Sequence, residues 1–316
     1  MEMTNSVNFA LQAIYDRRSP GFTFQQSFAG FHEMENLPFT ASKPFRFLVG
    51  PDKKAFMMHA DLVAHLSKPL AVLINGKMKE AREGYAELPE VDERTFVRFC
   101  QFAYTGDYKV PAPTSSELAD TPSTFIPNTW FQPNTQMGKP CVPSPARSMT
   151  SLLWDSFKGR TYTVPNPQPP PKEALQSGTP PVTTLEVFLS HARVYVLADY
   201  YDIERLRILS VKKLHKSLAS SLSPKTPDCI TPLVKYCFEN TVDKCDAKDP
   251  LRELVTGYMA CKIDQLWKND AFQDLVGSSG ELSKALVGAL ADEVAKPWDT
   301  LHEASRERRP MNRFLA

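Results

Sequence analysis

Six cysteines and six histidines are the residues of this chain with the widest chemical range. Metal ligation in proteins usually starts from a tight pair of ligands such as Cys-x-x-Cys, and the chain has no such pair. We therefore expect no metal site, and reduced cysteines with mainly structural roles. The cysteines are Cys100, Cys141, Cys229, Cys237, Cys245 and Cys261.

His59 is the histidine that most resembles a general base, because it lies where a predicted strand passes into a predicted helix. A histidine beside apolar residues in that position is more often a hydrogen-bonded structural group. Nucleophilic catalysis also needs a serine or cysteine in a recognisable motif, and there is no Gly-x-Ser-x-Gly, phosphate-binding glycine loop or His-Glu-x-x-His. We expect no catalytic residues, no cofactor and no enzymatic activity.

The charge balance argues against two classes of partner. The chain has 37 Lys plus Arg and 36 Asp plus Glu, which gives a formal net charge of +1. No overall field draws it to a phosphate backbone or an anionic membrane, and no apolar run approaches the roughly 20 residues that span a bilayer. The first residues lack the basic start and apolar core of a signal peptide. We expect a protein of the cytoplasm, the nucleus or both that binds neither nucleic acid nor membrane.

Two strands that form a hairpin are predicted after residue 40. Phe45, Phe47 and Val49 alternate with other residues, which is typical of a half-buried strand. Turn-forming residues follow at 50–52, and the run at 55–59 supplies the returning strand. A further short strand is expected at Tyr85–Leu88.

Two helical regions accompany these strands. One apolar face runs through residues 61–75, and we expect Pro69 to divide it into two shorter helices. Asp92 predicts the cap of a second region that ends at Gly106. The first face is made by Leu62, Leu66, Leu70 and Leu73.

The composition changes at residue 109, and 15 of the 27 prolines fall in residues 109–182. Such a segment lacks amide donors and apolar periodicity, so we expect an extended or disordered insert. Its apolar patch Ser151–Phe157 is expected to dock locally. Pro167, Pro170 and Lys172 have the spacing of an SH3-domain ligand, although a match of this kind is expected from the composition alone.

Helical signals return at Thr183, which forms a capping box with Glu186. A second helix is expected after Asp202 and should reach residue 218. Residues 230–294 then predict further amphipathic helices, with enough aromatic and leucine side chains for a small core.

The order of these elements and their motifs resembles a BTB/POZ domain. The motifs are Phe56-x-x-His59, Leu62-x-x-x-x-Ser67, Tyr104-Thr105-Gly106 and Ala198-Asp199-x-Tyr201-x-x-x-x-Leu206. The chain is most similar to BTB proteins of filamentous fungi, through Asn75–Glu80, Tyr104–Tyr108 and Asp249–Leu254. In that family the Ala-Asp-x-Tyr helix pair belongs to the BTB fold, so the resemblance implies a domain that continues on both sides of the insert.

The resemblance also implies a non-catalytic role in protein–protein interaction, as an adapter or an oligomerisation module. Adapters of this class that recruit a cullin ubiquitin-ligase scaffold have an apolar-x-Glu motif where this chain has Met78 and Glu80. Met78 would enter an apolar groove, Glu80 would accept hydrogen bonds, and Tyr104 would join the same face. Alternatively, Met78 closes the domain's own core and Glu80 is a solvated charge.

The expected fold class is therefore α+β, a BTB/POZ fold followed by an all-helical domain. The expected divisions are a weakly ordered lead-in at 1–39, the interrupted domain at 40–218, a BACK-like helical extension at 219–300 and a tail at 301–316. Expected partners are proteins: a cullin scaffold, a client, and a second BTB chain in a homo- or heterodimer. A transcription-associated or chromatin-associated scaffold is the alternative, although no zinc-finger spacing or basic recognition helix supports it.

Overall fold

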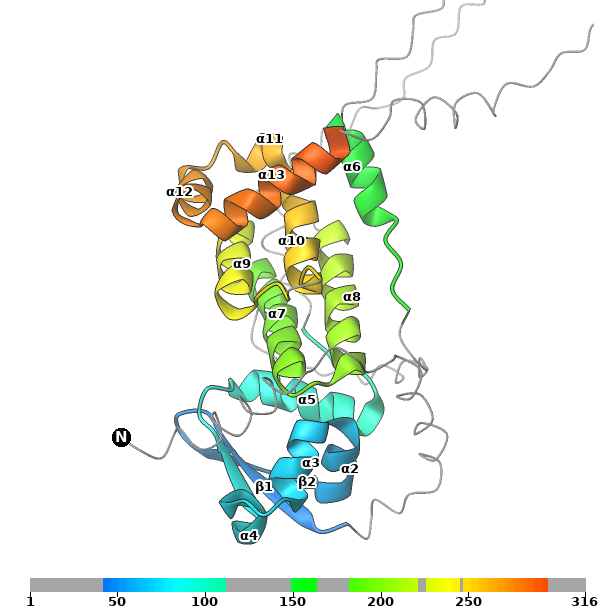
Figure 1. Ribbon diagram of the computed structural model, residues 1–316, viewed down its shortest axis with the longest axis vertical. Coiled ribbons are helices and arrows are strands. Elements are labelled where there is room, and N and C mark those ends of the chain that lie inside the picture. Colours follow the sequence, from blue (N-terminus) through cyan, green and yellow to red (C-terminus); the bar gives the residue numbers. More distant parts are fainter. Residues whose placement is uncertain (1–41, 112–148, 164–181, 221–225, 245–246, 295–316) are drawn as a thin grey trace, which may run out of the picture. The chain divides into compact units, whose positions relative to one another are not determined.

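The computed structural model describes residues 42–111, 149–163, 182–220, 226–244 and 247–294 (Figure 1). They form an α+β protein with a small three-stranded mixed sheet, many helices and a mostly helical C-terminal region. They divide into two compact units. Unit 1 comprises residues 42–111, 163 and 190–212, and unit 2 comprises 149–162, 182–189, 213–220, 226–244 and 247–294. Two helices, α7 (Thr184–Tyr200) and α8 (Glu204–Ser220), supply residues to both units.

The sheet of unit 1 has the strand order β2-β1-β3. β1 pairs antiparallel with β2 and parallel with β3. The predicted alternation is confirmed, since every second side chain of β1 from Phe45 is buried. The hairpin turn needs a left-handed backbone at Gly50 and Lys53, which glycine adopts at little cost. The bounds are β1 Pro44–Val49, β2 Lys54–His59 and β3 Tyr85–Leu88.

The helices of unit 1 follow the predicted pattern, including the division of the apolar face near Pro69 into two helices. Ser67 is extended between α2 and α3, and its Oγ accepts the Leu70 N–H at 3.1 Å. Pro69 lies in the first turn of α3, where a missing N–H breaks no helical hydrogen bond. Ser67 therefore caps the second helix, and Pro69, which has no N–H to continue the first helix, prevents a single continuous one. The bounds are α2 Ala60–Leu66, α3 Lys68–Asn75, α4 Lys79–Glu83 and α5 Glu93–Thr105.

Both predicted ends of α5 are confirmed. Asp92 Oδ2 accepts the Thr95 N–H at 3.0 Å and so satisfies a first-turn donor. Gly106 has φ +73°, and its N–H donates to the Phe102 carbonyl. These two residues fix where the helix starts and stops.

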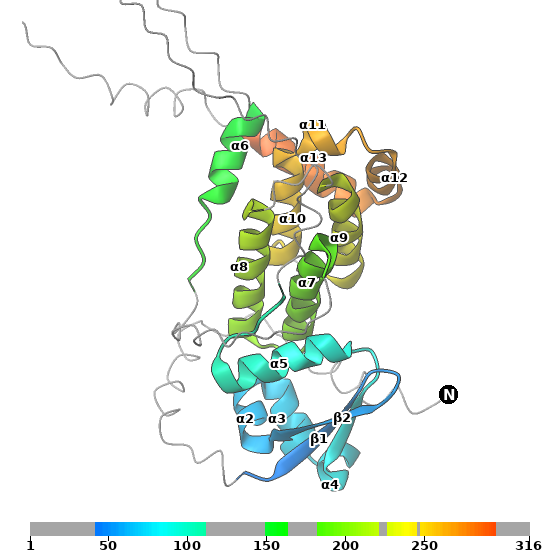
Figure 2. The same ribbon diagram turned by 180° about the vertical axis from the view of Figure 1, so that it is seen from behind.

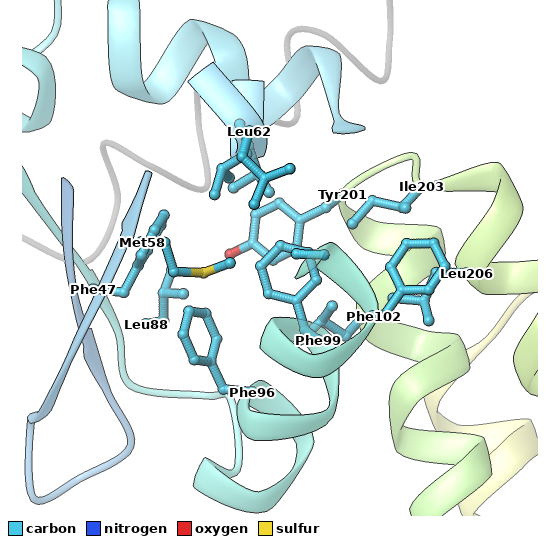
Figure 3. Close-up of a cluster of buried hydrophobic side chains, with 14 of the residues drawn as sticks. Phe47, Met58, Leu62, Leu88, Phe96, Phe99, Phe102, Tyr201, Ile203 and Leu206 are labelled. Atoms are coloured by element: carbon cyan, nitrogen blue, oxygen red, sulfur yellow. The ribbon is translucent and has the colours of Figure 1, made fainter. Parts of the chain in front are cut away.

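The core of unit 1 joins side chains from both sides of the predicted insert (Figure 3). Ser67 Oγ also donates to the Tyr201 carbonyl at 2.5 Å, a bond between residues 134 positions apart. The segment that carries Tyr201 thus completes the core that the sheet and α5 begin. Its members include Phe47, Met58, Leu62, Leu88, Phe96, Phe99, Phe102, Tyr201, Ile203 and Leu206.

Unit 2 is built around α10, which packs against α6, α9 and α13 (Figure 2). Arg252 of α10 is buried, and its guanidinium donates to Thr241 and to the Phe238 carbonyl and pairs with Glu281. Asp249 caps the same helix by accepting the Leu251 and Arg252 N–H groups. The bounds are α6 Met149–Lys158, α9 Thr226–Asn240, α10 Pro250–Cys261, α11 Ile263–Leu266, α12 Asp270–Ser278 and α13 Gly280–Val294.

One part of the expected insert is ordered. Residues 149–158 form α6, which includes the apolar patch Ser151–Phe157 and packs against α10. The expected local docking of this patch is therefore confirmed, and Phe157 is its buried aromatic side chain. At the next predicted start, the Glu186 N–H donates to Thr183 Oγ1 at 3.2 Å and α7 follows.

Other predictions fall outside the described residues. They concern the lead-in at 1–39, the SH3-type ligand at Pro167, Pro170 and Lys172, and the tail at 301–316. None of the helices in the described part of the chain is both long and apolar enough to cross a membrane.

Candidate functional site

The segment that carries Met78 and Glu80 begins where α3 is closed by Gly76. The Gly76 N–H donates to the Val72 carbonyl at 2.8 Å. A Cβ at this position would lie 2.2 Å from the same carbonyl oxygen, so only glycine fits. The chain then turns through residues 76–78 and enters the five-residue helix α4, with Met78 at the position before it.

Met78 and Glu80 are both half-buried. Among the described residues, Met78 is not one of the apolar side chains that pack against the core of unit 1. In the same part of the chain, no recorded hydrogen bond or ion pair engages the Glu80 carboxylate, whereas Lys79 pairs with Glu83 at 3.7 Å. A thioether and a carboxylate are thus presented at the start of α4.

Tyr104 occupies the last turn of α5, and its side chain is 52% exposed. Its hydroxyl accepts the His59 backbone N–H at 3.3 Å and lies 2.9 Å from His59 Nδ1. The hydroxyl can either donate its hydrogen to Nδ1 or accept one from it, so the contact fits both tautomers of the ring. His59 is hydrogen-bonded here as the sequence suggested, and the Tyr104 ring is held in place while half of it faces solvent.

The sheet places these residues at one of its ends. His59, the last residue of β2, pairs with Pro44 at the start of β1. The Arg46 N–H donates to the carbonyl of Gly84, the residue between α4 and β3. β2 and β3 flank β1 and so lie about 10 Å apart. Tyr104 is therefore hydrogen-bonded to β2, one edge strand, and the Met78–Glu80 segment precedes β3, the other edge strand. Within the described residues, no hydrogen bond joins Tyr104 to Met78 or Glu80.

A buried tyrosine–histidine pair is a feature that sequence reasoning missed. Tyr108 Oη lies 2.8 Å from His191 Nδ1, and both side chains are buried in unit 1. Burial raises the pKa of Tyr108 well above its ordinary value, while Arg98 opposes that shift. The pair joins the chain after α5 to α7. Tyr108 belongs to the motif Tyr104–Tyr108 and so could have been singled out from the sequence. Its partner His191 could not, because it is 83 positions away.

Cys100 and Cys237 have environments that make their thiols weakly reactive. Burial raises the pKa of the Cys100 thiol to about 12, and the same cause raises the pKa of Cys237. Cys100 Sγ contacts Met58 Sδ at 3.6 Å. Because only the thiolate is a good nucleophile, both side chains act as small apolar groups at neutral pH. Within the described ranges, no group of three His, Cys, Asp or Glu side chains is arranged to hold a metal.

Two comparisons with known proteins were made. No family model matches the chain, and no curated protein matches it.

Proposed function

We propose that this chain is a BTB/POZ protein-interaction adapter whose domain is interrupted by residues 109–182. Unit 1 supplies the BTB/POZ domain, and the helices α9 to α13 supply a BACK-like extension. One observation carries the proposal: the segment with Ala198, Tyr201 and Leu206 shares a core with Phe47 and Phe99. The resemblance to BTB proteins requires this arrangement.

The contact surface of the adapter is the sheet end that carries Met78, Glu80 and Tyr104. A flexible thioether can fill an irregular apolar groove, and an unpaired carboxylate can accept hydrogen bonds from a partner's surface. Tyrosine is enriched among residues that dominate interface energetics, and Tyr104 is already positioned by His59. The partner of this surface is the amino-terminal domain of a cullin, and unit 2 is the place where a client binds.

Binding to a cullin amino-terminal domain is the direct test, measured by titration calorimetry with the full chain. The expected affinity is micromolar or better. The double substitution Met78→Ala with Glu80→Ala should cost about 2 kcal/mol or more, a loss of about 30-fold, because both side chains would be interface anchors. Arg82→Ala is the matched control, since Arg82 is an exposed residue of the same helix. Absence of binding by the unaltered chain would sink the cullin proposal.

Tyr104 can be tested by two substitutions that separate its ring from its hydroxyl. Tyr104→Ala should weaken cullin binding by about 1–2 kcal/mol, as for a typical aromatic anchor. Tyr104→Phe removes the bonds to His59 but keeps the exposed ring, so it should weaken binding less. If both variants stay folded by circular dichroism and bind as tightly as the unaltered chain, Tyr104 does not belong to the surface.

A further inference from the structure

Helix α6 is held in unit 2 by two aromatic side chains. The Trp154 and Phe157 rings stack with centroids 5.6 Å apart and planes 11° apart. Both also meet the Tyr258 ring of α10 edge-on, at 6.0 Å and 5.5 Å between centroids. Phe157 is 2% exposed, and the Phe157 and His215 rings are also in edge-on contact. Phe157 is therefore inserted into unit 2, and the Trp154 ring stacks over it.

Polar groups of unit 2 fix the orientation of this helix. His215 Nε2 lies 2.8 Å from the Phe157 carbonyl, one of the last carbonyls of α6, which also accepts the Arg160 N–H at 3.3 Å. Lys262 Nζ lies 3.9 Å from the centre of the Trp154 ring, within cation–π range. Arg160 pairs with Glu253 at 3.4 Å. The receiving side chains come from two helices, α8 and α10, and from Lys262 just beyond α10.

Gly257 is a residue of α10 that lies close to Arg160 and Phe157. A Cβ at Gly257 would lie 3.0 Å from Arg160 Nη2 and 3.8 Å from Phe157 Cδ2. The nearest atom is the end of a flexible arginine side chain, which can move by a few tenths of an ångström, so Gly257 marks the close contact of α10 with Arg160 and Phe157. We call the face formed by His215, Glu253, Gly257, Tyr258 and Lys262 the aromatic-helix surface.

We propose that the aromatic-helix surface is a binding site for a short helix of the pattern Trp-x-x-Phe-x-x-Arg, and that α6 is its built-in, exchangeable ligand. α6 has only 10 residues, and a helix of this length is not stable in water by itself. It meets the rest of the chain through residues 112–148 and 164–181, which lie outside the described ranges. Its surface ion pair adds little to its attachment, since Glu253 is 56% exposed. Attachment therefore depends mainly on the buried Phe157 ring, the stacked Trp154 indole with its Lys262 contact, and the hydrogen bond of His215 to the Phe157 carbonyl.

The partner that fits this surface is consequently an aromatic amphipathic helix with a trailing arginine. Such a helix binds by laying its apolar face into a groove, and its large apolar side chains, spaced one helical turn apart, fill the groove. The occupant in the isolated protein is the chain's own α6. The inference does not depend on cullin binding, because the two proposals concern different residues.

A labelled peptide of residues 149–163 provides the test, with binding followed by fluorescence anisotropy. The full chain with Trp154→Ala and Phe157→Ala has its own helix disabled and should bind the peptide. The unaltered chain should bind it at least about tenfold more weakly, because its surface is already occupied at high effective concentration. A peptide with Ser156→Ala is the matched control and should bind like the parent, since Ser156 is exposed. A peptide with both aromatic residues replaced should not bind.

The site of binding is checked by Gly257→Leu, which adds a side chain where Arg160 and Phe157 approach but suits an α-helix. In the chain with its own helix disabled, this change should weaken peptide binding at least about tenfold. If the disabled chain does not fold, hydrogen exchange on the unaltered chain replaces it: excess peptide should accelerate exchange at the amides of α6.

Several outcomes would overturn the proposal. They are a folded disabled chain that does not bind the peptide, equal binding by the unaltered chain, and binding that Gly257→Leu leaves unchanged. A dimer of the unaltered chain that excess peptide converts to monomer would place the helix of a second copy on the surface. That result would contradict the assignment of α6 to its own chain.

Discussion

The two units use different means to hold their chain segments together. Unit 1 has an aromatic core that brings residues 45–108 together with residues 194–206. Unit 2 centres on α10, where a buried arginine bonds to the end of α9 and to α13, and α6 attaches through two rings. In unit 1 the distant segment is part of the core. In unit 2 the distant helix α6 is added to a face.

This difference decides which segment each unit can release. Removing the segment around Tyr201 would open the core of unit 1 and expose several phenylalanine rings to water. Removing α6 would uncover Tyr258 and His215 but leave the contacts of α10 with α9 and α13 in place. We therefore expect unit 1 to be indivisible and unit 2 to tolerate exchange of a helix.

The largest expected effect is that of Phe47→Ala in unit 1. The Phe47 side chain is fully buried, with ring centroids of Phe45 and Phe96 at 5.1 Å and 5.3 Å. Loss of a buried phenylalanine typically costs about 3–5 kcal/mol. Denaturant unfolding should show this loss, and hydrogen exchange should rise in β1, α5 and residues 194–206 more than in α10. Val97→Ala, at an exposed position of α5, is the control. Equal loss of protection in α10 would contradict the division into units.

Arg252→Met tests the polar part of unit 2. The substitution keeps the aliphatic stem but removes donors to Thr241 and to the Phe238 carbonyl. Leaving such buried acceptors without these donors should cost about 2–4 kcal/mol. Hydrogen exchange should increase in α9 and α13 while β1 stays protected. Glu281→Gln should cost less than about 1 kcal/mol, because Glu281 is 71% exposed. A larger effect of the glutamate change would mean that the ion pair dominates.

The smallest expected effect is a pH dependence of α6 attachment. Burial lowers the pKa of His215 below its ordinary 6.5, Arg160 also lowers it, and the bond to Phe157 opposes the shift. Because the docked state favours neutral His215, attachment is fully stabilised above pH 6.5 and weakens as pH falls from there toward the lowered pKa. Peptide affinity for the disabled chain should drop between pH 7.5 and 5.5. His215→Gln should flatten this dependence, and an unchanged slope would assign it to another group.

Local signals in the sequence predicted much of unit 1. The alternation at Phe45–Val49, the strand at Tyr85–Leu88 and the caps at Asp92 and Gly106 are all present. Each of these strands and caps depends on residues that are close together in the chain, so the residues that cause it can be recognised in the sequence. The division predicted near Pro69 is also present, whereas the Ser67 cap that starts the second helix was not predicted.

Features that depend on distant residues were not predictable. The bond of Tyr104 to His59 and the pair of Tyr108 with His191 require a known fold before the partners can be chosen. The same holds for the docking of Trp154 on Tyr258, since the apolar patch at Ser151–Phe157 predicted local docking but not the residue that it contacts. The sequence did single out Met78, Glu80 and Tyr104 as surface candidates, and binding to a partner remains a prediction for all three.

The most direct test of unit 1 is the thermal melt of a fragment that ends at Pro111. A fragment of residues 40–111 keeps the whole sheet and α5 but lacks Ala198, Tyr201 and Leu206. We predict that it shows no cooperative transition by circular dichroism, whereas the complete chain does. A cooperative melt of the fragment, with native-like near-ultraviolet signal, would show that the core closes without the later segment and would contradict the interrupted domain.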